Sequence, residues 1–243
     1  MTRVRRQFGV RTALAVWRRL VTSASVDAAR RQLGATVSAR RQTRPARGRE
    51  VVVGLVGRSI QASRTPRMHE LEGSRIGLGY TYVLIDFDTL DLADADLGAM
   101  VEAARQLGFA GLNVTHPFKQ SILPLLDDLA PEAAAIGAVN TVVFADGRRT
   151  GHNTDCWGFA ESFREGLAGV PMDSVVQFGA GGAGAAVAHA LLSLGARRLT
   201  LCETEPERAE RLAARLADRF GASVGVSGDA ALALADASGL VNA

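Results

Sequence analysis

The feature that most constrains this chain is a run of small residues, Gly179-Ala180-Gly181-Gly182-Ala183-Gly184, which follows an apolar segment ending at Phe178. The first, third and sixth residues of the run have the G-x-G-x-x-G spacing. The flanking residues predict a strand at 174–178 and a helix at 183–194. A strand, a glycine turn and a helix in this order are typical of a dinucleotide-binding unit, because the missing Cβ atoms let the backbone approach a pyrophosphate.

An acidic residue at the end of the next predicted strand supports this interpretation. The strand covers 198–202 and is followed by Glu203, which lies 19 residues after Gly184, close to the spacing expected for a carboxylate that binds ribose hydroxyls. Glu203 would repel a 2′-phosphate, and Thr204 offers no cation to bind one. The sequence therefore predicts NAD as the cofactor, with NADP less favoured. The alternative is a tight strand–helix turn without a ligand.

The chain contains 27 arginines and a single lysine, Lys119. Lysine can give and take a proton, whereas arginine is permanently charged. Pro117 suits the start of a helix, so Lys119 is expected in a first helical turn, where the macrodipole disfavours a cation. A residue that breaks a local rule in this way is a candidate for catalysis, although a single lysine can also arise by chance.

Charge divides the chain into two parts. Residues 1–49 carry 13 arginines and one acid, whereas residues 50–243 carry 15 basic residues and 24 acids. The first part resembles an organelle presequence, upstream sequence read through, or a nucleic-acid-binding arm. We expect it to be a disordered extension outside the fold, and the acidic remainder does not indicate a nucleic-acid partner.

Several functional classes find little support in the composition. The sequence has no run of 18 apolar residues, so we expect no membrane span. Two cysteines form no disulfide framework, and the four histidines lack metal-ligand spacing, so no metal is expected. A reduced, cytoplasmic location is the default for such a chain.

Apolar runs alternate with helical patterns along residues 50–243, which predicts an α/β fold with mainly parallel strands. We predict a disordered extension at 1–49, an α/β substrate-binding domain at 50–153, a connecting helix at 154–170 and a Rossmann-like dinucleotide-binding domain at 171–243.

The motifs together resemble the shikimate dehydrogenase family, most closely its NAD-preferring quinate/shikimate dehydrogenase branch. The matching stretches are Gly54-Leu55-Val56-Gly57, Ser63-Arg64-Thr65-Pro66, Gly111-Leu112-Asn113-Val114-Thr115-His116-Pro117-Phe118-Lys119, Gly137-Ala138-Val139-Asn140-Thr141, Gly151-His152-Asn153-Thr154-Asp155 and the glycine run.

The resemblance implies a role for each candidate residue. Ser63 and Thr65 would hold the substrate carboxylate, and Lys119 with Asp155 would form the catalytic pair. The residues that would contact ring hydroxyls are Asn113, Thr115, Asn140 and Asp155. The implied reaction is a reversible hydride transfer between a ring hydroxyl of shikimate or quinate and NAD(P). The sequence does not decide which member of the pair takes the proton, and we favour Lys119. A homodimer is a further hypothesis.

In the family, further strands and a helix follow the position of Val241, so we expect the dinucleotide-binding domain to be truncated at its C-terminal end. This leaves one alternative from another functional class, a non-catalytic dinucleotide-binding remnant. A rival enzyme class, the methylene-tetrahydrofolate dehydrogenases, is disfavoured because the Ser63/Thr65 pair indicates a small carboxylate.

Overall fold

The computed structural model describes residues 10–43 and 48–243, and for residues 10–23 and 43 it describes the backbone alone. The chain forms two compact units, Met1–Asn113 and Val114–Ala243, which we describe one at a time. Within the described ranges, no helix combines the length and the apolar character that a bilayer crossing requires.

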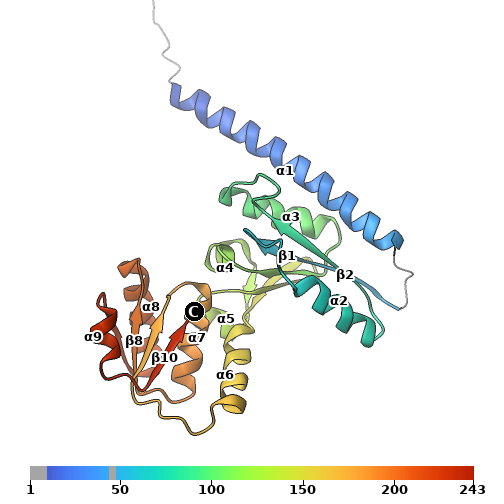
Figure 1. The fold of residues 1–243 in the computed structure, drawn as a ribbon. Coiled ribbons are helices and arrows are strands. Elements are labelled where there is room, and N and C mark those ends of the chain that lie inside the picture. The colour runs from blue at the N-terminus through green and yellow to red at the C-terminus, as the bar shows by residue number, and fades with distance from the viewer. Residues whose placement is uncertain (1–9, 44–47) are drawn as a thin grey trace, which may run out of the picture. The chain divides into compact units, whose positions relative to one another are not determined.

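Strands and covering helices alternate in the described part of the first unit (Figure 1). Its elements are α1 (Val10–Thr43), β1 (Glu50–Gly57), α2 (Thr65–Arg75), β2 (Gly79–Asp86), η1 (Asp94–Asp96), α3 (Leu97–Gln106) and β3 (Gly111–Val114). The strand order is β2-β1-β3, and β1 pairs in parallel with β2 along the whole of both strands. Both strands are largely buried, as expected for strands of a parallel sheet that helices cover.

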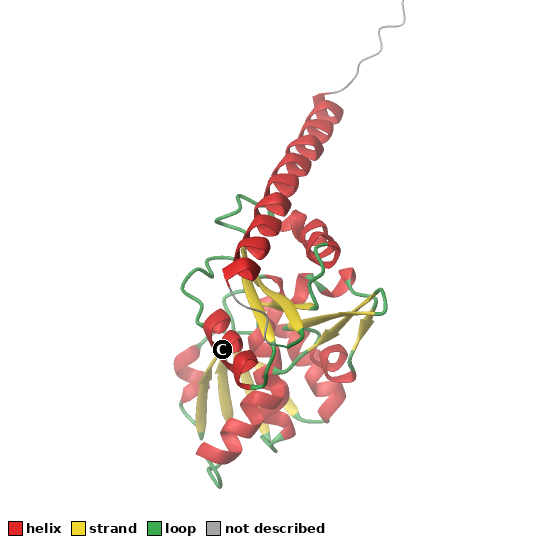
Figure 2. Ribbon diagram, turned by 90° about the vertical axis from the view of Figure 1, so that its right-hand side faces the viewer, coloured by secondary structure: helices red, strands yellow, loops and turns green. Residues whose placement is uncertain are grey.

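Helix α1 corrects the expectation of a disordered N-terminal extension. Figure 2 shows it as one continuous helix. Ala29, Leu33 and Val37 recur every four residues and so share one face of the helix, and all three are buried. Helix α1 contacts β2 and α3 of the first unit. The expectation of disorder came from the many arginines in this segment. Residues 1–9 and 44–47, to which the expectation also applied, lie outside the described residues.

The second unit contains a hairpin and a parallel sheet. Its elements are α4 (Phe118–Ser121), η2 (Leu123–Leu125), β4 (Asp128–Leu129), α5 (Pro131–Ile136), β5 (Thr141–Ala145), β6 (Arg148–His152), α6 (Asp155–Gly166), β7 (Val175–Phe178), α7 (Gly182–Ser193), β8 (Arg198–Cys202), α8 (Pro206–Phe220), β9 (Ser223–Val226), α9 (Ala230–Leu234) and β10 (Gly239–Asn242). Strands β5 and β6 pair antiparallel, and Asp146 and Gly147, which both have positive φ values, form the turn between them.

The parallel sheet has the order β10-β7-β8-β9. Since β7, β8 and β9 advance in one direction, right-handed crossovers put α7 and α8 on the same face, where they contact each other. The chain then returns to β10 on the other side of β7. This arrangement is one half of a Rossmann-like fold, and the reversal beside β7 is the point where such sheets bind ligands. The predicted α/β fold class is confirmed.

The compact units divide at residue 113, whereas the sequence placed the domain boundary at residue 153. The difference arises from side-chain packing, because Ile136 and Ala138 belong to the same buried cluster as Leu191 of α7 and Leu199 of β8. The segment that precedes α6 therefore shares a core with the glycine loop. The assignment of substrate-binding and dinucleotide-binding roles to the predicted ranges stays a prediction.

Candidate active site

The predicted catalytic pair is in direct contact. Lys119 Nζ lies 2.5 Å from Asp155 Oδ2, and the two side chains are 16% and 33% exposed. Asp155 is the first residue of α6, where Asn153 Oδ1 accepts hydrogen bonds from the N–H groups of Asp155 (3.1 Å) and Cys156 (3.4 Å). This capping contact fixes the start of the helix and with it the place of the carboxylate. A group that can exchange a proton therefore lies against a fixed carboxylate.

The helix that carries Lys119 is a single turn. The sequence predicts that it begins at Pro117, and α4 covers Phe118–Ser121 with Pro117 at its N-cap. Pro124 has no N–H to donate to the preceding turn and restricts the residue before it, which explains why the α-helix stops so early. A single turn carries a small dipole, so Asp155 rather than a helix terminus dominates the surroundings of Lys119.

The side-chain amide of Asn140 is fully used within the second unit. Its Nδ2 donates to Asp155 Oδ1 and to Thr154 Oγ1, both at 2.8 Å. Its Oδ1 accepts from Thr154 N (3.1 Å) and from Thr141 Oγ1 (3.0 Å). An amide has two donors and two acceptor lone pairs. Asn140 therefore orients Asp155, and its contact with a ring hydroxyl, which the resemblance implies, stays a prediction.

A cavity of about 230 Å³ lies beside Lys119 and the glycine loop. The loop approaches the lysine closely, because a Cβ built on Gly182 would lie 2.6 Å from Lys119 Cβ. The two predicted functional elements of the second unit thus face one space. Its lining residues are Thr115, His116, Pro117, Lys119, Gly181, Gly182, Ala183, Gly184 and Ala243.

The glycine loop has the geometry that a phosphate requires. Gly179 has a φ of 95°, which favours glycine, and a Cβ on Gly184 would lie 2.3 Å from Gly179 O. Gly181 is the N-cap of α7 and makes no side-chain capping bond, and a Cβ at this position would meet nothing within 4 Å. The residues at the start of α7 line the cavity, and the free N–H groups of a helix start fit the pyrophosphate of a dinucleotide.

The side chain of Gln177 fixes the shape of this loop from the protein interior. Its side chain is fully buried, and its Nε2 donates to Gly179 O and to Gly184 O, both at 2.8 Å. Its Oε1 has no hydrogen-bond partner. The sequence indicated only a buried strand at this position, because one polar residue in an apolar strand gives no sign of which groups it will bind.

The carboxylate of Glu203 is bound by the chain itself. Oε2 accepts from Ala180 N at 2.8 Å, and Oε1 accepts from Thr204 N (2.8 Å) and Thr204 Oγ1 (2.9 Å). Burial raises the pKa of Glu203, but these hydrogen bonds together with one from Glu205 N outweigh it, so the pKa lies below its usual value. Glu203 is therefore ionised and placed beside the glycine loop, as the sequence predicts for a ribose-binding carboxylate.

Three arginines on α8 were not singled out in the sequence, although their spacing on one helix face was readable. Arg208 Nη1 lies 3.7 Å from Glu203 Oε2, and its Nη2 lies 2.6 Å from Glu205 Oε1. Arg208, Arg211 and Arg215 line a cavity of about 490 Å³. Positive charge thus lies near Glu203 even though Thr204 supplies none.

The remaining candidates, Ser63, Thr65 and Asn113, belong to the first unit. Ser63 Oγ donates to Thr65 Oγ1 at 3.0 Å, and Thr65 N donates to Ser63 Oγ at 3.3 Å. The Tyr82 hydroxyl donates to Asn113 Oδ1 at 2.7 Å. Burial, followed by the neighbouring Tyr80, raises the pKa of Tyr82 far above its usual value, so this donor stays protonated. The sequence analysis missed Tyr82, because strand patterning predicts only a buried aromatic residue there.

The cysteines and histidines do not assemble into a metal site in the part of the chain that the structure describes. Cys202 is buried, and Cys156 Sγ lies 3.5 Å from His189 Nδ1. Burial, and then the charge of Arg219, lowers the pKa of His189. These groups belong to the core of the second unit.

Known proteins resemble this chain over most of its length. The family described as "Shikimate dehydrogenase substrate binding domain" matches residues 55–142. The "Shikimate dehydrogenase (NADP(+))" of Streptomyces avermitilis is 53% identical over 200 residues, which cover 79% of this chain and 67% of the relative. The "Quinate/shikimate dehydrogenase (NAD(+))" of Corynebacterium efficiens is 46% identical over 197 residues, covering 79% and 69%.

A solved structure agrees with these relatives. The quinate dehydrogenase from Corynebacterium glutamicum in complex with NAD superposes with a TM-score of 0.73 at 43% identity, covering 81% of this chain and 71% of the other. The chain thus spans about two thirds of the length of the relatives it matches. The extent and level of identity confirm the predicted relationship, and the chain belongs to the shikimate dehydrogenase family.

Proposed function

We propose that this chain catalyses reversible hydride transfer between a ring hydroxyl of shikimate or quinate and a nicotinamide dinucleotide. The observation that carries the proposal is the contact between Lys119 and Asp155 beside a cavity that the glycine loop also lines. A proton-exchanging pair next to a phosphate-binding loop is what the oxidation of an alcohol requires, because the hydroxyl loses a proton while its carbon loses a hydride.

Lys119 takes the proton of the reacting hydroxyl in this scheme, and Asp155 orients Lys119. Asn140 binds the other carboxylate oxygen, so Asp155 cannot turn away. The dinucleotide, when bound, accepts the hydride. The close approach of Gly182 to Lys119 brings the phosphate-binding loop and the proton acceptor to one space.

Substrate recognition is assigned to the polar side chains that the sequence predicted. Ser63 and Thr65, whose hydroxyls already lie side by side, would bind the carboxylate. Asn113 and Thr115 would bind ring hydroxyls, and they discriminate a polyol because an analogue leaves their hydrogen bonds unmade. Asn140 acts through Asp155. Both shikimate and quinate are proposed as substrates, because the names of the relatives include both.

We propose NAD as the preferred dinucleotide, bound by Gly179, Ala180, Gly181, Gly182, Ala183, Gly184 and Glu203. An ionised carboxylate at the ribose position repels a 2′-phosphate, and the nearest arginine, Arg208, is paired with Glu205. Relatives of this chain are named for NAD and for NADP, so the preference has to be measured.

Steady-state formation of the reduced dinucleotide, with shikimate and with quinate, tests the proposal. Lys119→Ala should lower turnover by about 10²-fold or more, since general acid–base catalysis contributes that much. Lys119→Arg is the matched control, because it keeps the charge and the ion pair with Asp155 but cannot lose a proton. It should be as impaired as Lys119→Ala. Dinucleotide binding should persist in both variants.

Near-normal turnover in Lys119→Arg would remove the lysine from proton transfer. Dinucleotide binding by the unchanged chain without turnover on either substrate would instead support the non-catalytic alternative. The homodimer and the cytoplasmic location stay predictions.

A further inference from the structure

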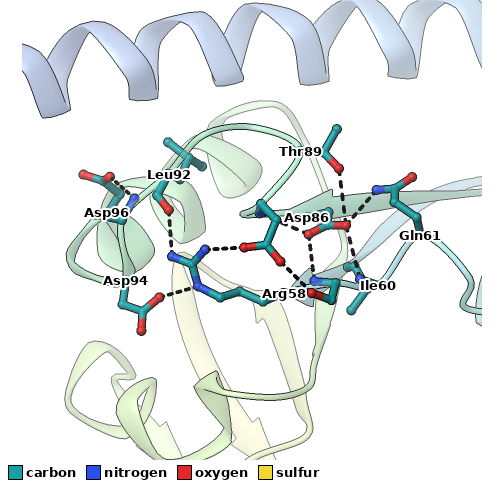
Figure 3. A network of polar contacts seen from close by, with 11 residues as sticks. Arg58, Ile60, Gln61, Asp86, Thr89, Leu92, Asp94 and Asp96 are labelled. Atoms are coloured by element: carbon teal, nitrogen blue, oxygen red, sulfur yellow. Dashed lines mark hydrogen bonds and ion pairs between the residues drawn. The ribbon is translucent and has the colours of Figure 1, made fainter.

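A buried carboxylate lies at the end of β2 in the first unit. Asp86 is only 2% exposed, and Figure 3 shows donors converging on it from the segment after β1 and from the segment after β2 itself. A buried charge of this kind is stable only when hydrogen bonds replace its water. Its Oδ1 accepts from Ser59 N (3.1 Å) and Asp88 N (3.2 Å), and its Oδ2 accepts from Ile60 N (3.2 Å), Gln61 Nε2 (2.9 Å) and Thr89 Oγ1 (3.4 Å).

The acceptor capacity of Asp86 is consumed by the protein. A carboxylate offers about four lone-pair sites, and five donors occupy them here. Asp86 therefore does not bind a ligand itself. Its effect has to pass through the residues that donate to it. Two of its three backbone donors, Ser59 and Ile60, lie in the segment that connects β1 to α2.

This connection is held in an unusual conformation. Ser59 has a φ of 53°, in the left-handed region that a residue other than glycine rarely adopts. Such a conformation persists only where its surroundings determine it. Ser59 Oγ donates to Asp88 Oδ2 at 2.7 Å, and Arg58 donates to Asp88 at 2.6 Å. Arg58 also donates to Asp94 at 2.7 Å (Figure 3). The backbone after β1 is thus fixed by Asp86 from within and by an ion-pair network from without.

The fixed turn leads directly to the hydroxyl pair. Ile60 N donates to Asp86, and the C=O of Ile60 accepts a hydrogen bond from Ser63 N at 2.9 Å. Ser63 Oγ in turn contacts both the hydroxyl and the N–H of Thr65. Hydrogen bonds, joined by the covalent bonds within Ile60 and Ser63, therefore connect the buried carboxylate to the two side chains that the proposed function assigns to the substrate carboxylate.

We propose that Asp86 is a positioning residue for the substrate carboxylate: through Ile60 it sets the place and direction of the Ser63 and Thr65 hydroxyls. This inference rests on the proposed function, which gives those hydroxyls their ligand. A site whose supporting residues are removed loses its geometry before it loses its binding groups. The consequence is selective, because only the carboxylate end of the ligand depends on this chain of bonds.

The test compares the binding of shikimate and quinate with the binding of their methyl esters, which lack the carboxylate charge, by calorimetry on the unchanged chain and on Asp86→Asn. In Asp86→Asn an NH₂ group replaces one acceptor oxygen and faces N–H donors. We expect the preference for acid over ester to fall by about tenfold, as a displaced binding group would produce, while ester affinity changes little. In turnover, KM should rise and kcat should be largely kept.

Glu72→Gln is the matched control, since its side chain is 61% exposed and its ion pair with Arg75 takes no part in the contacts of Asp86 or of the Ser59 turn. It should keep the acid-over-ester preference. A folded Asp86→Asn that also keeps the full preference would overturn the inference and leave the proposed function intact. Failure of the unchanged chain to bind either acid would overturn the proposed function and the inference together.

Hydrogen exchange on the unchanged chain covers the case in which Asp86→Asn does not fold. The amide protons of Ser59, Ile60 and Ser63 should all be protected, because each has an acceptor in the structure. The acid should slow exchange at Ser63 further, and the ester should not. Rapid exchange at Ser63, or equal protection by acid and ester, would contradict the positioning role.

Discussion

Adding one methyl group at Gly182 should disable the site although no catalytic residue is substituted. A Cβ at this position would lie 2.6 Å from Lys119 Cβ and 3.1 Å from Lys119 Cδ. Carbon atoms pack at about 3.5–4.0 Å, so Lys119 has to move by about 1 Å. Its Cβ cannot swing away alone, because Lys119 O accepts a hydrogen bond from Val139 N at 2.7 Å and holds the backbone in place.

Two quantities should change in Gly182→Ala. Overpacking of this kind costs about 1–3 kcal/mol, which denaturant unfolding would detect. A misplacement of about 1 Å in a catalytic group costs about 10²-fold in turnover, which steady-state kinetics with shikimate and quinate would detect. Gly158→Ala in α6 is the control, because its added methyl would meet nothing within 4 Å, and it should keep full activity. A Gly182→Ala variant with normal stability and turnover within about threefold of the unchanged chain would refute the reasoning.

Three further predictions concern the cofactor, the N-terminal helix and pH. Glu203→Ala should narrow the difference between NAD and NADP affinity by about tenfold, because it removes a ribose acceptor and the repulsion of a 2′-phosphate; an unchanged ratio in dinucleotide titrations would count against the ribose role of Glu203. Leu33→Ala should lower the free energy of unfolding by about 2–5 kcal/mol, the usual cost of truncating a buried leucine, whereas an effect below about 0.5 kcal/mol in urea unfolding would mean that α1 is not docked. Burial lowers the pKa of His189, so the unfolded chain takes up its proton first and stability should fall as the pH drops below about 6.5. The decline should be shallower in His189→Asn, and identical pH profiles of the unfolding free energy would contradict this.

The elements with strong local signals were predictable from the sequence. The strand predicted at 198–202, and the strand and helix predicted at 174–178 and 183–194, occur with bounds that differ by at most one residue. Their turn residues and apolar patterns agree with the fold that they form. The N-terminal helix was missed for the opposite reason. Its stripe of Ala29, Leu33 and Val37 is narrow, and the surrounding arginines dominate any average over composition.

The residue types of the candidate site were predictable from the sequence, but the hydrogen bonds between them were not. The contact between Lys119 and Asp155 followed from the family resemblance, whereas the saturation of Asn140 did not, because it depends on a turn that brings together residues 14 and 15 positions apart. The contacts of Asp86 could not be predicted either. An acid at the end of a strand often lies in a solvated turn, and only the tertiary structure shows that Asp86 is buried and accepts hydrogen bonds from five donors.

The buried amide of Gln177 has a consequence for how tightly a dinucleotide can be held. Its Nε2 donates to a carbonyl at each end of the glycine loop, and its Oε1 has no hydrogen-bond partner. Burying that oxygen without a partner costs about 1–3 kcal/mol. The two bonds from Nε2 restrict the backbone of the loop before any ligand binds. A ligand that meets a rigid loop has less disorder to remove on binding. Part of the affinity for the dinucleotide is thus set during folding, by a side chain that never touches it.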